Sequence, residues 1–188
     1  MRPLARVLCG FAIVAAAFIP AVAQTPTAPN GLMGDLIKDV SDVESKIAGL
    51  AKAMPASAHD WRPGKGVRST SEVLVHVAAD NYFVPAALGF PAPAETGISG
   101  KDYKTAAAFE KKPMTRDQAM TELQKSFAFL KKSMAAVPEA KLGETVELFG
   151  QKATGRNIWV NTVTHLHEHL GQLIAYARSN NVTPPWSK

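Results

Sequence analysis

The amino-acid sequence predicts an all-α protein, a four-helix bundle, because three stretches repeat apolar residues at steps of three and four. That spacing places side chains on one face of a helix. A fourth stretch combines apolar residues and histidines at the same spacing. No convincing sheet, repeat period or low-complexity tract accompanies them. With 188 residues, 46% of them hydrophobic and 20% charged, the chain has the composition of one globular domain.

The first 23 residues have the features of a cleaved signal peptide. Arg2 and Arg6 precede an apolar run over residues 7–19, and residues 21–23 are small enough for cleavage before Gln24. A retained membrane anchor is the alternative, but the apolar run is shorter than the ~20 residues that span a bilayer. We therefore expect an exported chain, periplasmic or extracellular, with no membrane span after cleavage.

The expected organisation is a signal peptide over 1–23, a spacer over 24–31 and a helical domain over 32–188. Cys9 lies in the apolar run, so cleavage would leave no cysteine, and any metal would be held by imidazole, carboxylate or water. Loss of Arg2 and Arg6 reduces the formal charge from +5 to +3, since 21 − 2 = 19 basic residues face 16 acidic ones. The remaining basic residues are scattered, so nucleic-acid binding is not expected.

The first expected helix ends at Pro55. Its apolar face is formed by Leu36, Val40, Val43, Ile47, Leu50 and Met54. After a linker around Trp61, Ser69 and Glu72 have the spacing of a capping box and begin a second helix, which carries His76 and stops near Pro85.

Proline and glycine recur from residue 89 to residue 113, which indicates an insertion over one end of the bundle, with a short helical turn over 103–109. Thr115 and Gln118 predict the cap of a third helix that continues to Pro138. Residues 144–149 alternate polar and apolar, so a short strand or hairpin is an option there. Thr154 is the expected cap of a fourth helix over 155–180.

Histidines on the second and fourth helices are the candidate functional residues. His165 and His169 are four apart and project from successive helical turns, and His76 is expected to face the core where the fourth helix packs. Three imidazoles would leave positions for water or substrate and suit Zn, Ni, Fe or Cu better than Mg or Ca. A hydrogen-bonded core role remains the alternative, since such a pair also arises by chance.

Other polar residues near these histidines have secondary roles in this interpretation. Asp80, Gln172 and Tyr176 could orient the ligands or a bound water, or lie on a helix surface. His167 points about half a turn away and His59 lies in a linker, so both are expected to be structural or solvent-facing.

Two segments resemble the DinB-like metal-binding four-helix proteins. They are Leu74-Val75-His76-Val77-Ala78 and Thr164-His165-Leu166-His167-Glu168-His169-Leu170-Gly171-Gln172-Leu173. The similarity extends to Trp61-Arg62-Pro63, to Thr154-Gly155-Arg156 and to the tail over 184–187, and covers roughly residues 32–186. It implies an up-down-down-up bundle with one divalent metal held by the residues that match the motif, His76, His165 and His169.

Relatives of this kind include transferases and isomerases in which the metal activates a small thiol. Two departures weaken that assignment here: Leu170 stands where the family often has Arg, and a signal peptide directs the chain away from cytosolic thiols. The sequence thus leaves two functions open. One is a metal-dependent transferase or hydrolase on a small molecule, and the other is an exported metal-binding, ligand-binding or interaction module without turnover.

Two further options concern haem and self-association. A haem protein is less favoured, since the sequence has no Cys-x-x-Cys-His motif. A homodimer is an option, because Trp159 and Ile174 form a second apolar flank on the fourth helix and are expected to be exposed.

Overall fold

The computed structural model describes residues 30–187, and within this range the chain is mostly helical. The long helices are α1 (Leu32–Ala53), α3 (Thr70–Ala87), α5 (Arg116–Ala135) and α6 (Gly155–Ser179). The short elements are α2 (Ala56–His59), α4 (Tyr103–Glu110), the 3-10 turns η1 (Ala94–Thr96) and η2 (Glu139–Gly143), and the strands β1 (Thr145–Leu148) and β2 (Gln151–Thr154). The expected signal peptide and most of the spacer lie outside the described residues.

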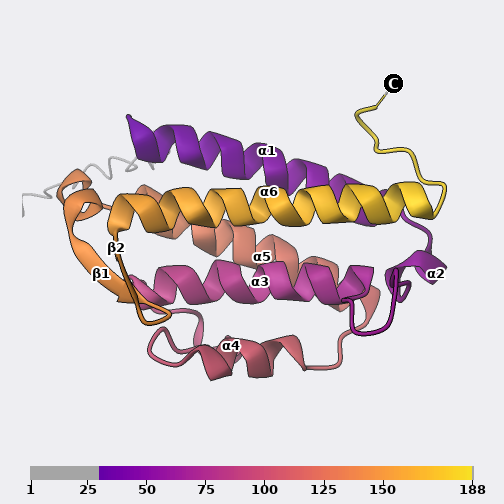
Figure 1. Ribbon diagram of the computed structural model, residues 1–188, viewed down its shortest axis with the longest axis horizontal. Helices are drawn as coiled ribbons and strands as arrows, with labels where there is room; N and C mark the ends of the chain where they lie inside the picture. Colours follow the sequence, from indigo (N-terminus) through magenta and orange to yellow (C-terminus); the bar gives the residue numbers. More distant parts are fainter. Residues whose placement is uncertain (1–29, 188) are drawn as a thin grey trace, which may run out of the picture.

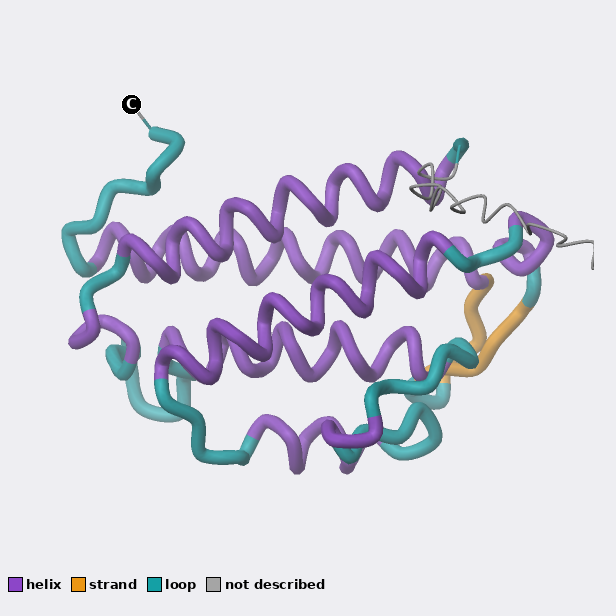
Figure 2. Tube along the Cα trace, turned by 180° about the vertical axis from the view of Figure 1, so that it is seen from behind, coloured by secondary structure: helices purple, strands orange, loops and turns teal. Residues whose placement is uncertain are grey.

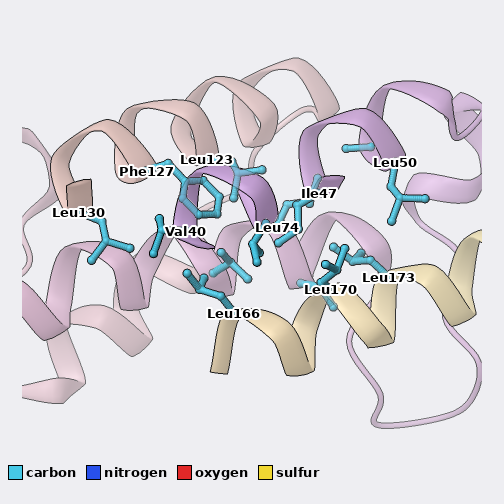
Figure 3. Packing of buried hydrophobic residues seen from close by; sticks show 14 of the residues in the cluster. Val40, Ile47, Leu50, Leu74, Leu123, Phe127, Leu130, Leu166, Leu170 and Leu173 are labelled. Carbon is cyan, nitrogen blue, oxygen red and sulfur yellow. The ribbon is translucent and has the colours of Figure 1, made fainter. Parts of the chain in front are cut away.

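The four long helices pack side by side around one apolar core (Figures 1 and 2). Helix α1 contacts α5 and α6, and α3 contacts the same two helices from the other side. Figure 3 shows apolar side chains from all four helices meeting between the ribbons. Those labelled are Val40, Ile47, Leu50, Leu74, Leu123, Phe127, Leu130, Leu166, Leu170 and Leu173. Burial of this apolar surface is the main source of the fold's stability.

The starts of the long helices agree with the caps expected from the sequence. Ser69 and Glu72 exchange reciprocal hydrogen bonds at the start of α3, and Thr115 and Gln118 do the same at the start of α5. The side chain of Thr154 accepts a hydrogen bond from a backbone N–H in the first turn of α6. Helix α3 continues two residues beyond Pro85, because a proline in the last turn removes only one backbone hydrogen bond.

The segment between α3 and α5 differs from its expected place. Instead of covering an end of the bundle, α4 lies along the outer side of α3 (Figures 1 and 2). The physical reason is a second apolar cluster, in which Ala106 and Phe109 of α4 are buried against Val75, Tyr82 and other side chains of α3. This docking brings the end of α4 beside the middle of α3.

A two-stranded antiparallel hairpin precedes α6, in the region where the alternation predicts a strand. Residues Thr145 and Thr154 pair at its open end, and Leu148 and Gln151 pair next to the turn. In Figure 1 the hairpin lies near the C-terminal end of α3. The turn consists of Phe149 and Gly150, and both have positive φ angles.

The second apolar flank of α6 is not free for a partner. Trp159 is only 2% exposed and belongs to the main core, so the expectation that it is exposed at a dimer interface is wrong. Ile174 is partly buried against the same core. Helix α1 packs along α6 and covers this flank, which apolar periodicity alone cannot reveal. Across residues 30–187, no helix combines the length and apolar character that crossing a membrane requires.

Candidate metal centre

Three histidines from two helices converge on one point between α3 and α6. His165 and His169 project from successive turns of α6, and His76 faces them from α3. The ring centroids of His76 and His169 are 4.7 Å apart, those of His76 and His165 are 5.4 Å apart, and those of His165 and His169 are 4.4 Å apart. One nitrogen of each ring lies within 4.8 Å of the other two. His76 is buried, and the other two are half-buried.

A chain of hydrogen bonds along α6 fixes the proton on His169. The hydroxyl of Tyr176 donates to the backbone carbonyl of Arg68 at 3.0 Å, so it accepts from Nε2 of Gln172 at 2.8 Å. The amide oxygen of Gln172 therefore faces Nδ1 of His169, 2.9 Å away. Because this oxygen can only accept, the neutral ring carries its proton on Nδ1 and keeps a lone pair on Nε2. That is the state in which an imidazole binds a metal.

His76 is oriented in the same way by a carboxylate on α4. Its Nδ1 donates to Oε1 of Glu110 at 2.9 Å, and Oε2 of Glu110 accepts from the guanidinium of Arg68 at 3.0 Å. Arg68 thus supports both histidines. Its backbone carbonyl accepts from Tyr176 in the chain that leads to His169, and its guanidinium binds the carboxylate that accepts from His76. This arrangement leaves Nε2 of His76 directed away from Glu110, toward the cluster.

Asp80 lies directly against the cluster, one turn after His76 on α3. Its Oδ2 accepts a hydrogen bond from Nε2 of His165 at 2.9 Å and is 3.4 Å from Nε2 of His76. Its other oxygen, Oδ1, is buried and has no hydrogen-bond partner among the described residues. Ligand atoms of His76, Asp80 and Glu110 also lie within 4.8 Å of one another and form a second group of potential ligands that shares His76 with the first.

Burial and neighbouring charges move the pKa values of the cluster in different directions. Burial lowers the pKa of His169 to about 4, and the charges of His165 and His76 add to that effect. The hydrogen bond to Asp80 raises the pKa of His165 despite partial burial. Burial disfavours the charged form of Glu110, but hydrogen bonds and charges from His76 and Arg68 outweigh it and hold the pKa of Glu110 below its usual value.

The donor set fits a divalent transition metal. Three imidazoles on two rigid helices are typical ligands of zinc, nickel or iron, and the acceptors behind His76 and His169 supply the outer hydrogen bonds that such ligands usually make. The partnerless Oδ1 of Asp80 is a second indication, because a buried carboxylate oxygen without a hydrogen bond is costly unless a cation or a bound water satisfies it.

The three residues with expected supporting roles all lie at the cluster. Gln172 and Tyr176 form the hydrogen-bond chain behind His169, and Asp80 contacts two of the histidine rings. The sequence reasoning missed Glu110 and Arg68. Glu110 stood in a segment interpreted as an insertion, and neither residue carries a local signal for contact with a histidine far along the chain.

The two remaining histidines lie elsewhere. His59 is buried, and its Nε2 is 3.0 Å from the carbonyl oxygen of Ala51, so its role is structural. Burial lowers the pKa of His59. His167 is partly exposed on α6 and hydrogen-bonds to Asp39 of α1 at 2.9 Å. Neither ring reaches the cluster.

A cavity of about 420 Å³ adjoins the cluster. It lies among α3, α6 and the hairpin, and Asp80 and His165 form part of its wall. The other wall residues include Val84, Leu148 and Phe149. Its volume is within the range of about 300–1,000 Å³ that is usual for small-molecule sites. A small molecule in this cavity would therefore lie beside two members of the cluster.

Comparison with known proteins relates the chain to one family. The family model of the DinB superfamily matches residues 40–173. A DinB-like protein from Bacillus subtilis is 16% identical, with a TM-score of 0.60 over 79% of this chain and 93% of that chain. A DinB-like protein from Bacillus cereus is 11% identical, with a TM-score of 0.63 over 84% and 97%. A conserved protein from Enterococcus faecalis is 12% identical, with a TM-score of 0.65 over 80% and 97%. No curated protein matches the sequence significantly.

The lowered pKa of His169 predicts an acid-sensitive fold for the metal-free protein. In the unfolded chain this ring binds a proton near pH 6.5, whereas in the folded chain it does so only near pH 4. The unfolded state therefore binds more protons between these values, and the free energy of unfolding should fall as the pH falls from 6.5 to about 4. Denaturant titrations of the chelator-treated protein at a series of pH values measure this slope.

A His169→Gln variant should show a shallower decline of the unfolding free energy over the same pH range, because its side chain does not titrate. His167→Gln is the matched control, since His167 is on the same helix but outside the cluster, and it should retain the slope. Equal slopes in the wild type and in the His169→Gln variant would contradict the prediction.

Proposed function

The chain belongs to the DinB superfamily, and we propose that it is an exported protein that binds one divalent transition-metal ion through His76, His165 and His169. The observation that carries this proposal is the convergence of three imidazole nitrogens within 4.8 Å. Two of the rings have an acceptor at Nδ1, which leaves Nε2 free for an ion. An unliganded core would not need three adjacent imidazoles.

The proposal includes the up-down-down-up order of the four long helices. It is supported by the length of the segment between α3 and α5, which contains α4 and runs back along α3 (Figure 1). Such a segment allows α3 and α5 to point the same way. The arrangement matters for the site, because it makes α3 and α6 neighbours and lets the α4 segment contribute Glu110.

We favour a metal-dependent hydrolase or transferase that acts on a small molecule. When bound, a zinc, nickel or iron ion acts as a Lewis acid that activates a water or polarises a substrate oxygen or sulfur. Asp80 would accept a proton there, since it lies against two Nε2 atoms and lines the adjoining cavity. Gln172, Tyr176 and Glu110 would keep the rings oriented through their hydrogen bonds.

A thiol-dependent transferase is less favoured by the site. Leu170 stands where relatives often have Arg, and it is buried in the main apolar core. The chain therefore has apolar packing at a position where those relatives have a cation. The neighbouring charges are the carboxylates of Asp80 and Glu110 and the guanidinium of Arg68, which pairs with Glu110, so the net charge beside the cluster is negative and would repel an anionic thiol in the absence of metal.

The alternative is a binding module without turnover. Its supporting observation is the position of Asp80, whose Oδ2 is close to Nε2 of both His76 and His165. If this oxygen became a fourth ligand, the ion would have a closed set of protein ligands, as structural zinc sites do. The two functions therefore differ in whether one coordination position is open to exchange.

Elemental analysis of the purified, tag-free protein should find about one equivalent of a transition metal per chain. A His165→Gln/His169→Gln double variant should lose it, because it removes two of the three nitrogens. His167→Gln should keep the full equivalent. The bound metal should also raise the melting temperature of the wild type, since it binds the folded state alone. Absence of metal from the wild type after reconstitution with zinc, nickel and iron would refute the site.

Cobalt substitution should reveal an open coordination position. Cobalt(II) in the three-histidine site would absorb visible light, and azide should shift that absorption if a position is open to exchange. The Asp80→Asn variant should show at least as large a shift, because an amide binds metal more weakly than a carboxylate. A cobalt spectrum that azide leaves unchanged in the wild type but alters in Asp80→Asn would favour the closed, non-catalytic module instead.

Export is proposed on the pattern of residues 1–23 alone, with the domain beginning near residue 32 and the mature chain in the periplasm or outside the cell. When the full chain is expressed in a secreting bacterium, the recovered protein should begin at Gln24. Recovery of a chain that keeps Met1 in the membrane fraction would instead support a retained anchor.

A further inference from the structure

The cavity beside the metal centre has mostly apolar walls and few charges. Its apolar side chains are Val84, Leu148, Phe149, Ala153, Ile158 and Leu166. Asp80 and Lys152 are its oppositely charged residues, and the amides of Asn81, Asn157 and Asn161 add neutral polar atoms. Such a surface has no group of like charges that could bind an ionic ligand. An apolar part of a ligand would be shielded from water there.

Phe149 is the most unusual residue of this wall. It is 62% exposed, and its φ angle is 53°. With Gly150 it forms the two-residue turn of the hairpin, in which both residues have positive φ. Turns of this type favour Asn-Gly, because a bulky side chain in the left-handed region is strained. The hairpin would form more easily with asparagine at this position.

The ring of Phe149 is held in place by two other aromatic side chains. Its centroid is 5.5 Å from that of Phe83 on α3 and 5.1 Å from that of Tyr103 on α4. The rings of Phe83 and Tyr103 are also 5.1 Å apart. These contacts fix the hairpin tip beside the cavity but leave most of the Phe149 side chain exposed. A strained, exposed ring at the edge of a cavity is a candidate ligand contact.

We propose that this cavity binds an uncharged small molecule with an aromatic or branched alkyl group, and that Phe149 packs against that group. The apolar walls supply the affinity, and in the metal-free protein the opposite charges of Asp80 and Lys152 favour an ionic ligand of neither sign. A polar group on the ligand would face Asp80 and His165. The position of this polar group beside a metal ion is the only part of the proposal that rests on the proposed function.

Binding of the neutral fluorophore N-phenyl-1-naphthylamine tests the proposal. Its fluorescence should rise saturably with about one site per chain. Phe149→Asn should weaken binding roughly tenfold, the equivalent of one lost aromatic contact. Because asparagine tolerates the left-handed conformation, the relieved backbone strain offsets the lost contacts with Phe83 and Tyr103, and this variant should melt close to the wild type. Trp186→Ala removes another exposed aromatic residue, outside the cavity wall, and should leave binding unchanged.

Three results would overturn the proposal. They are the absence of saturable binding to the wild type, equal affinity in Phe149→Asn, and an anionic analogue, 8-anilino-1-naphthalenesulfonate, that binds the metal-free wild type as tightly as the neutral probe does. If Phe149→Asn fails to fold, Asn161→Trp replaces it, because this exposed wall residue can narrow the cavity without entering the core. Asn161→Trp should also weaken binding of the neutral probe, and unchanged affinity in this variant would again overturn the proposal.

The His169→Gln variant separates this proposal from metal binding. His169 is not part of the cavity wall, so the variant should bind the neutral probe with unchanged affinity even after losing metal. Loss of metal with retained probe binding supports both proposals. If the wild type binds the probe but no metal, only the metal site is refuted. If the wild type binds metal but not the probe, only the apolar pocket is refuted.

Discussion

Hydrogen-bond acceptors outside the cluster fix the proton on two of its three imidazoles, and the fold around this site depends on supplying those acceptors. Glu110 of α4 provides one for His76, and Gln172 of α6 provides one for His169. Residue 68, just before α3, joins both through its guanidinium and its backbone carbonyl. Elements outside the four long helices, a loop before α3 and the short helix α4, therefore hold the side chains at the centre of the site.

The parts of the structure that follow from local rules could be predicted from the sequence. Apolar spacing gave the four long helices, and the capping pairs at Ser69 and Thr115 gave the starts of α3 and α5. The four-residue spacing of His165 and His169 placed both on one face of α6. These inferences succeeded because each depends on residues within one or two helical turns of one another.

Other features depend on contacts between distant segments and could not be predicted locally. Glu110 reaches His76 only because Phe109 and Ala106 anchor α4 on α3, and nothing in the proline-rich sequence before α4 indicates that docking. The burial of Trp159 likewise depends on a contact between distant segments. Periodicity identifies an apolar flank on α6, but it cannot say whether α1 of the same chain or a second copy covers it.

The histidine cluster and the hairpin differ in how much change they tolerate. The three imidazoles sit on long helices whose other faces form the core, so moving any of them would disturb packing at several points. The hairpin tip is held by the contacts of Phe149 with two other aromatic rings and by a two-residue turn, and it lies outside the main core. Substitutions there can reshape the cavity wall while the ligand geometry stays fixed. Of the elements that line the cavity, the turn can therefore vary at the least cost to the core, whereas the lining residues on α3 and α6 are constrained by the packing of the bundle.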